Sequence, residues 1–198
     1  MKTHNLLITI IAACFILAGT SVKAQKASGN VVTRDITVAD FSGINLSEPI
    51  DYLITQGDKN LLIIETDDNL FDQVKADVSN GILSIDTHSL GGASRLKVTI
   101  QVKELKNLNI SGASNVKTTN TITSPELKIK ASGAAEATLD LNVPQLTSEL
   151  SGASNITLNG NATNHTLKAS GASDLKADNL QTSTTNVTLS GACTVKLA

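Results

Sequence analysis

The chain has 198 residues and a formal net charge of −2, and only 2% of its residues are aromatic. A nucleic-acid-binding protein needs a basic stripe or stacking rings, whereas this sequence has two arginines, Arg34 and Arg95, and no tryptophan. The length fits one domain, and a charge this close to balance implies no polyanionic partner.

Residues 1–24 have the pattern of a secretory signal peptide. An apolar run extends from Leu6 to Ala18, and Val22-Lys23-Ala24 supplies the positions that a signal peptidase recognises, so cleavage is expected before Gln25. The run is shorter than the roughly 20 residues that a transmembrane helix needs. We therefore expect an exported protein in the periplasm, at the outer-membrane surface or outside the cell, with no transmembrane segment in the mature chain.

Two alternatives for the N-terminus stay open: an uncleaved membrane anchor, and a lipoprotein attached through Cys14. Ile11-Ala12-Ala13-Cys14 has the small-residue pattern of a lipoprotein cleavage site, although Phe15-Ile16-Leu17 continues the apolar run beyond it. After cleavage before Gln25, Cys193 is the one remaining cysteine, so no intrachain disulfide can form. Residues 25–37 are expected to lead into a single domain that covers 38–198.

A repeat of about 20 residues is the most informative feature of the sequence. Ser-Gly-Ala occurs five times. The residues two and four before each glycine and four and six after it are mostly apolar, whereas the residues three before and five after it are polar. Such period-2 alternation on both sides of a glycine predicts two short strands joined at a corner. The five glycines are Gly112, Gly133, Gly152, Gly171 and Gly191.

The period favours an all-β, single-stack, right-handed parallel β-helix with coils of about 20 residues. The leucine-rich-repeat core pattern is missing, a propeller blade needs about 40 residues, and a sandwich would not keep so strict a register. Stacked coils should place the corner glycines in one column, with the alanine after each glycine packed inward. The side chains expected to be buried are Ile110, Val116, Leu150, Ile156, Leu167, Leu175 and Leu189.

The first half of the mature chain lacks the Ser-Gly-Ala mark but keeps the strand alternation, for example in 50–55, 61–65, 82–86 and 96–102. Asp67 to Val74 differs because apolar residues follow capping residues there, and it predicts a short helical turn.

No combination of residues predicts catalysis, a cofactor or a metal. The carboxylates between Glu65 and Asp72 lack the spacing of a calcium loop and are interpreted as a helix start. His88 and His165 have no second ligand at metal-binding spacing and are expected on the surface. Cys193 occupies a small-residue slot shared with Ser114 and its counterparts, and no base accompanies it.

The row three residues after each glycine is the most polar row of the repeat. It could be a binding stripe, although a solvated face with stacked amide side chains is the simpler interpretation. The row contains Asn115, Glu136, Asn155, Asp174 and Thr194.

Phe41-Ser42-Gly43-Ile44-Asn45 resembles the opening motif of the family called putative auto-transporter adhesin, head GIN domain. The strand from Ile50 that ends in Gln-Gly-Asp, the Asp67 to Val74 segment and the Ser-Gly-Ala coils resemble that family too. The resemblance covers about residues 38–198. It implies an exported β-helix typical of Bacteroidetes, with an adhesin-like role and no catalytic residues.

Three functions are compatible with this sequence. The first is a non-catalytic adhesin-like or interaction module that binds an unknown protein or glycan at the cell envelope. The second is a polysaccharide-active β-helix enzyme, which would need paired carboxylates across a cleft. The third is a structural or regulatory component of the envelope. We favour the first, because the repeat supplies a scaffold and no constellation supplies an active site.

Overall fold

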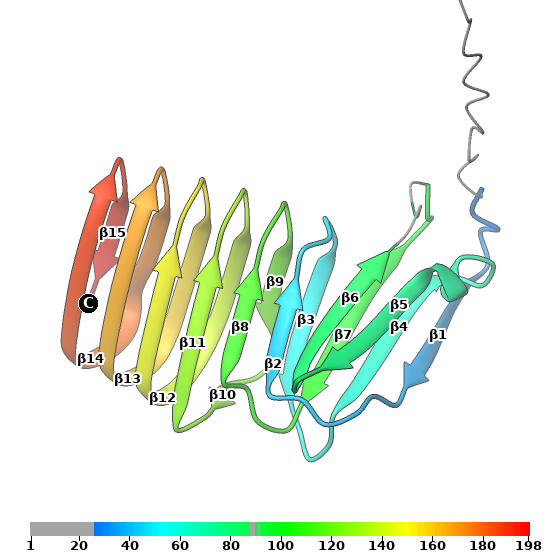
Figure 1. The fold of residues 1–198 in the computed structure, drawn as a ribbon, viewed down its shortest axis with the longest axis horizontal. Coiled ribbons are helices and arrows are strands. Elements are labelled where there is room, and N and C mark those ends of the chain that lie inside the picture. Colours follow the sequence, from blue (N-terminus) through cyan, green and yellow to red (C-terminus); the bar gives the residue numbers. More distant parts are fainter. Residues whose placement is uncertain (1–25, 88–89, 91) are drawn as a thin grey trace, which may run out of the picture.

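The computed structural model describes residues 26–87, 90 and 92–198, so the signal peptide, Cys14 and His88 lie outside it. One continuous 15-stranded sheet wraps into a stack of coils along the long axis of the molecule (Figure 1). In the described residues the structure is almost entirely β, which confirms the predicted all-β parallel β-helix.

The coils have two faces, which we call the β8 face and the β9 face. The β8 face contains β5 (Val74–Ser79), β6 (Ile82–Thr87), β2 (Gly43–Leu46), β8 (Asn107–Ile110) and β11 (Glu126–Ala131). The β9 face contains β1 (Val31–Ile36), β4 (Leu61–Asp67), β7 (Leu96–Val102), β3 (Asp51–Gln56) and β9 (Asn115–Thr118).

The later strands pass through both faces. They are β12 (Glu136–Leu150), β13 (Asn155–Gly171) and β14 (Asp174–Gly191), followed by β15 (Thr194–Leu197) on the β9 face. Pro144, Thr163 and Ser183 interrupt the pairing within these three strands and divide each into a β9-face half and a β8-face half. The short β10 (Ile122–Thr123) also pairs with β12 in parallel. From β8 onward, all pairings between strands of neighbouring coils are parallel.

The N-terminal end of the stack departs from this parallel rule. There β1 pairs with β4, β4 with β7, and β5 with β6, all antiparallel. Pairing is parallel from β6 to β2 and from β7 to β3, and it stays parallel where β2 and β3 join β8 and β9. The predicted helical turn is present as a single 3-10 turn, Phe71–Gln73.

The corner glycines lie in one column, as predicted. Gly133 and Gly152 have φ values of +72° and +71°, and a Cβ on Gly152 would meet the carbonyl oxygen of Gly133 at 2.7 Å. The same close approach recurs at Gly171 and Gly191, each against the glycine of the preceding coil. Glycine is therefore required twice over, by backbone conformation and by the distance between coils.

Large and small side chains alternate along one inward column of the stack. Ile110, Ala131, Leu150 and Ala169 stack in register and are all buried. Six of the seven side chains predicted to be buried are buried: Ile110, Val116, Leu150, Ile156, Leu167 and Leu175. The prediction that Leu189 is buried is wrong. Leu189 is 47% exposed, because it lies in the last β8-face segment and no described strand covers the outer edge of that segment.

The prediction that the alanine after each corner glycine packs inward is also wrong. Ala113, Ala134, Ala153 and Ala172 are exposed, and the residue after each of them is buried. Side chains alternate through the corner, so the second residue after the glycine points inward like the fourth. The buried corner residues are Ser114, Ala135, Ser154 and Ser173, and Cys193 continues their row half-buried.

Candidate functional site

The predicted polar row is aligned across the β9 face. Strand pairing places Asn115, Glu136, Asn155, Asp174 and Thr194 in successive register, and all five are exposed. Neighbouring strands are about 4.8 Å apart, so the row forms a regular ladder along the stack.

The row continues past the repeats toward the N-terminal end. Asp51 pairs with Asn115 and in turn with Lys97. From Asp51 to Asp174, carboxylates alternate with amides, so no two carboxylates are direct neighbours. This order avoids the repulsion of like charges placed opposite each other. Asn115 Nδ2 donates to Asp51 Oδ1 at 3.0 Å, and on the same face Asn159 Nδ2 donates to Asp140 at 2.9 Å.

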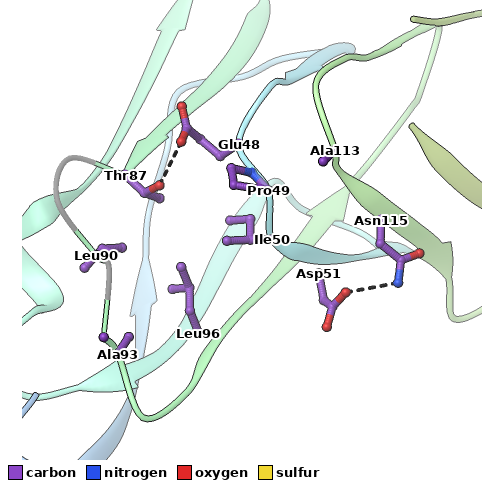
Figure 2. A pocket seen from close by; sticks show the side chains of 11 residues that line it. Glu48, Pro49, Ile50, Asp51, Thr87, Leu90, Ala93, Leu96, Ala113 and Asn115 are labelled. Carbon is purple, nitrogen blue, oxygen red and sulfur yellow. Dashed lines mark hydrogen bonds between the residues drawn. The ribbon is translucent and has the colours of Figure 1, made fainter. Parts of the chain in front are cut away.

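A hollow of about 560 Å³ lies at the Asp51 end of the row (Figure 2). We call it the corner hollow, because the Glu48-Pro49-Ile50 corner of the first coil forms one side of it. On the opposite side lie Leu90 and Ala93, which follow β6, and Leu96, the first residue of β7. Glu48 is half-buried at its edge, and Thr87 Oγ1 donates to its Oε2 at 3.1 Å.

A second hollow, of about 490 Å³, lies on the other side of Asp51 and Asn115. Its lining includes Arg95, Lys97 and Lys117, so it is more basic than the corner hollow. Arg95 forms an ion pair with Glu65. The N-terminal end of the polar row therefore lies between an apolar hollow with an acidic edge and a hollow with basic walls.

The β8 face has two shallow hollows of about 470 and 560 Å³ that share Lys130 and Ser132. Glu149 forms ion pairs there with Lys128 at 2.7 Å and with Lys130 at 3.3 Å. The hydrogen bond from Lys128, reinforced by Lys130, holds the pKa of Glu149 below its ordinary value although partial burial opposes the shift. Glu149 is thus paired with two of the three lysines that line these hollows.

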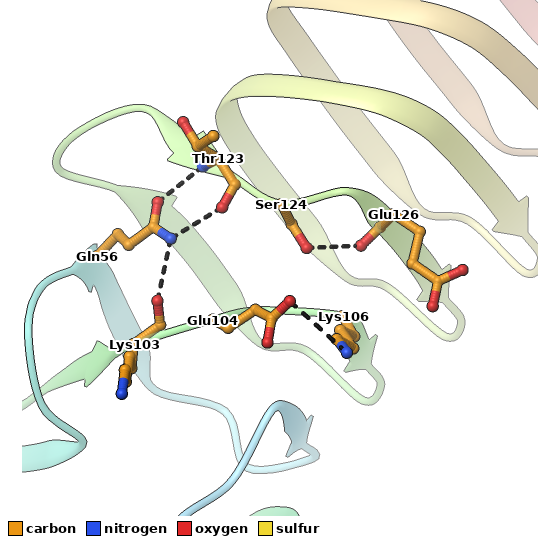
Figure 3. A network of polar contacts seen from close by, with 7 residues as sticks. All are labelled: Gln56, Lys103, Glu104, Lys106, Thr123, Ser124 and Glu126. Atoms are coloured by element: carbon orange, nitrogen blue, oxygen red, sulfur yellow. Dashed lines mark hydrogen bonds and ion pairs between the residues drawn. The ribbon is translucent and has the colours of Figure 1, made fainter.

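The glutamine of the Gln-Gly-Asp motif is structural (Figure 3). Gln56 Nε2 donates to the carbonyls of Thr123 and Lys103 at 2.8 and 3.1 Å, and Gln56 Oε1 accepts from the Thr123 N–H at 2.7 Å. The side chain of Asn120 in turn bonds the backbone N–H and carbonyl of Gln56. These bonds join the first coil to the next at the corner opposite the glycines.

The acidic cluster also has a structural role. Asp67 is buried, and its carboxylate accepts the backbone N–H groups of Gly29 and Ser94, each at 2.8 Å. Burial alone would raise the pKa of Asp67, but these hydrogen bonds lower it below its usual value. Within residues 26–87, 90 and 92–198, no group of three or more His, Cys, Asp or Glu side chains is placed to hold a metal ion.

The prediction of a surface position for His165 is wrong. His165 is 1% exposed inside the stack, with Nε2 3.1 Å from Ser148 Oγ, and burial lowers its pKa to about 4. Its place in the column of Leu127 and Leu146 explains this burial. Cys193 Sγ donates weakly to the carbonyl of Ser190 at 3.4 Å, as Ser173 Oγ does to Ser170 one coil earlier.

Sequence reasoning found the row but missed the corner hollow. Most of its lining comes from two stretches that are separated in the chain and belong to no repeat: residues 48–51, and the described lining residues Thr87, Leu90, Gly92, Ala93 and Leu96. One signal was available: Glu48-Pro49 interrupts an otherwise alternating stretch and marks a corner unlike the five glycine corners.

Comparison with known families gives one match, to the family model described as "Putative auto-transporter adhesin, head GIN domain", over residues 40–198. No curated protein matches the chain. In the part that the structure describes, no helix is long and apolar enough to cross a membrane.

Solved structures from Bacteroidetes share the fold. A "putative adhesin" from Bacteroides fragilis matches with a TM-score of 0.73 and 20% identity, covering 88% of this chain and 100% of that one. A "putative adhesin" from Parabacteroides merdae matches with a TM-score of 0.67 and 23% identity, covering 87% and 83%. A "putative lipid binding protein" from Parabacteroides distasonis matches with a TM-score of 0.65 and 18% identity, covering 88% and 99%.

Proposed function

We propose, from the premise that this chain belongs to the head GIN domain family of putative auto-transporter adhesins, that it is an exported, non-catalytic interaction module of the bacterial envelope. Its partner would be a protein or glycan bound along the β9 face. The signal-peptide pattern in residues 1–24 supports export.

The observation that carries this proposal is the unbroken polar row from Asp51 to Thr194. The row repeats donors and acceptors at the strand spacing over successive coils on an exposed face. Such a surface suits many weak polar contacts with an extended partner. A glycosidase would instead hold two carboxylates across a cleft, whereas Glu136 and Asp174 lie on the same open ladder.

The test compares two faces of the same coils. One variant carries Asn115→Ala, Glu136→Ala, Asn155→Ala and Asp174→Ala on the β9 face. The matched control carries Asn109→Ala, Lys130→Ala, Glu149→Ala and Lys168→Ala, which are aligned in the same way on the β8 face. The chain starting at Gln25 is measured against immobilised glycans and purified envelope fractions. Binding lost in the β9-face variant and kept in the control supports the proposal.

Equal loss in both variants, or no loss in either, would exclude the row as the binding surface. If the chain turns over a polysaccharide and Glu136→Gln abolishes that turnover, the enzyme alternative is favoured. The N-terminus of the exported protein provides a separate check. It should be Gln25, whereas a lipid-modified Cys14 would establish the lipoprotein alternative.

A further inference from the structure

The corner hollow combines an apolar floor with an acidic edge. Pro49 and Ile50 face Leu90, Ala93 and Leu96 across it, and Ile50, Leu90 and Leu96 pack against the hydrophobic core while staying half-exposed (Figure 2). Half-exposed aliphatic side chains around a hollow of about 560 Å³ leave apolar surface for a ligand to cover.

Among the described residues, the lining of the hollow carries two carboxylates and no cation. Glu48 and Asp51 are the charged residues among its lining. Arg95 and Lys97 belong to the neighbouring hollow, and Arg95 is engaged by Glu65. The negative charge at this edge therefore has no counter-charge among the described lining residues, which favours a cationic ligand.

Each carboxylate is oriented through one oxygen. Thr87 donates to Glu48 Oε2 and Asn115 Nδ2 to Asp51 Oδ1, and the second oxygen of each has no hydrogen-bond partner among the described residues. A guanidinium binds a carboxylate best when both oxygens are free for a bidentate pair, whereas an ammonium needs only one. The geometry therefore fits lysine better than arginine.

Resting on the interaction-module function, we propose that the corner hollow takes the side chain of a lysine presented by a partner protein. The aliphatic stem covers Ile50, Pro49 and Leu96, and the ammonium donates to the free oxygen of Glu48. Long cationic side chains commonly bury the stem and keep the charged end at a polar edge. Asp51 adds to the negative potential and joins the hollow to the polar row, so a partner lying along the row would insert this lysine at its N-terminal end.

The probe is Nα-acetyl-lysine N-methylamide, titrated into the chain starting at Gln25 while the methyl NMR signals of Ile50 and Leu96 are recorded. Saturable shifts of both methyl signals are expected. The norleucine analogue, which keeps the stem and lacks the charge, should bind about tenfold more weakly, because it loses a charge-assisted hydrogen bond. Equal binding of the two probes, or no saturable shift, would overturn the proposal.

Glu48→Gln keeps the shape of the side chain and should weaken lysine binding about tenfold. Glu126→Gln, an exposed carboxamide substitution on the β8 face, is the matched control and should leave binding unchanged. Thr87→Val removes the hydroxyl that orients Glu48 and should give a smaller loss, which separates positioning from charge. An unchanged affinity in Glu48→Gln, with an unaltered spectrum of the core methyls, contradicts the proposal even if the protein binds its partner along the row. Conversely, the β9-face substitutions could leave partner binding unchanged while the chain still binds the lysine probe. That result would retain the lysine site and exclude the row as the binding surface.

Discussion

The stack from β8 onward repeats one set of contacts, whereas the strands before it are joined by contacts that each occur once. In the repeated part, Gly133, Gly152 and Gly171 bring successive backbones together, and the alanine after each glycine donates its N–H to the glycine carbonyl of the coil before, at 2.8 Å. In the earlier part, Gln56 and Asp67 join segments far apart in the chain through side-chain hydrogen bonds.

The difference shows two ways of joining the coils of a β-structure that has no disulfide among its described residues. Repeated coils need mainly a residue that permits close stacking, because most residues of their strands are paired with the neighbouring coil. Antiparallel strands such as β1 and β5 end the stack at its N-terminal side, and their connections need side chains that satisfy stray backbone groups. Substitutions should therefore act through packing in the repeats and through single hydrogen bonds before them.

The largest effect is expected at the glycine column. Gly152→Ala places a methyl group 2.7 Å from a backbone oxygen at φ +71°, so both overlap and backbone strain oppose folding. We expect a loss of about 4 kcal/mol or more in the free energy of unfolding, measured by urea denaturation. Gly81→Ala is the matched control, since Gly81 has φ +73° but nothing within 4 Å of a new Cβ. It should lose about 1 kcal/mol. Equal losses at both positions would show that the coils do not approach as closely as described.

The next effect tests burial inside a repeated coil against burial at its end. Ile156→Ala removes a fully buried side chain in the middle of the stack and should lower the free energy of unfolding by about 3 kcal/mol. Leu189→Ala removes a side chain that is 47% exposed and should lower it by less than about 1 kcal/mol. A loss under half a kilocalorie for Ile156→Ala would place that side chain on the surface.

The sequence predicted the repeated part well because each row is sampled in every coil. The glycine column, the polar row and six buried positions follow from one alignment on Ser-Gly-Ala. The same alignment contained the correction for His165, since the sixth residue before the glycine is Leu127, Leu146 and His165 in successive coils. Leu189 was missed because a repeat fixes the direction of a side chain but not whether another coil covers it.

The N-terminal part could be predicted only as strands. Period-2 alternation is the same in parallel and antiparallel strands, so it could not reveal the antiparallel pairing of β1, β4, β5 and β6. The corner hollow depends on the approach of residues 48–51 to Thr87, Leu90 and Leu96, which no local pattern encodes. Sequence reasoning therefore predicted the polar row but missed the hollow at its end.

A smaller effect is expected where a single side chain joins two coils. Gln56→Ala removes three hydrogen bonds and leaves the Thr123 N–H and carbonyl without their partner, so the free energy of unfolding should fall by about 2 kcal/mol. Gln145→Ala is a suitable comparison, because Gln145 is exposed and occupies a paired position of the repeated part. It should change stability by less than about 0.5 kcal/mol. If the two variants behave alike, the N-terminal coils do not depend on this side chain.

The smallest effect concerns pH and returns to the interior of the repeats. Burial lowers the pKa of His165 to about 4, while an unfolded histidine titrates near 6.5. Between these values the unfolded chain binds a proton that the folded chain excludes, so stability is complete above pH 6.5 and is lost as the pH falls toward 4. From pH 7 to pH 5 the loss should be at most about 2 kcal/mol. His165→Gln retains a polar group that can bond Ser148 but cannot titrate, so its stability should fall less over that range. Parallel curves for the two proteins would mean that His165 keeps an ordinary pKa and that the interior at this coil is open to water.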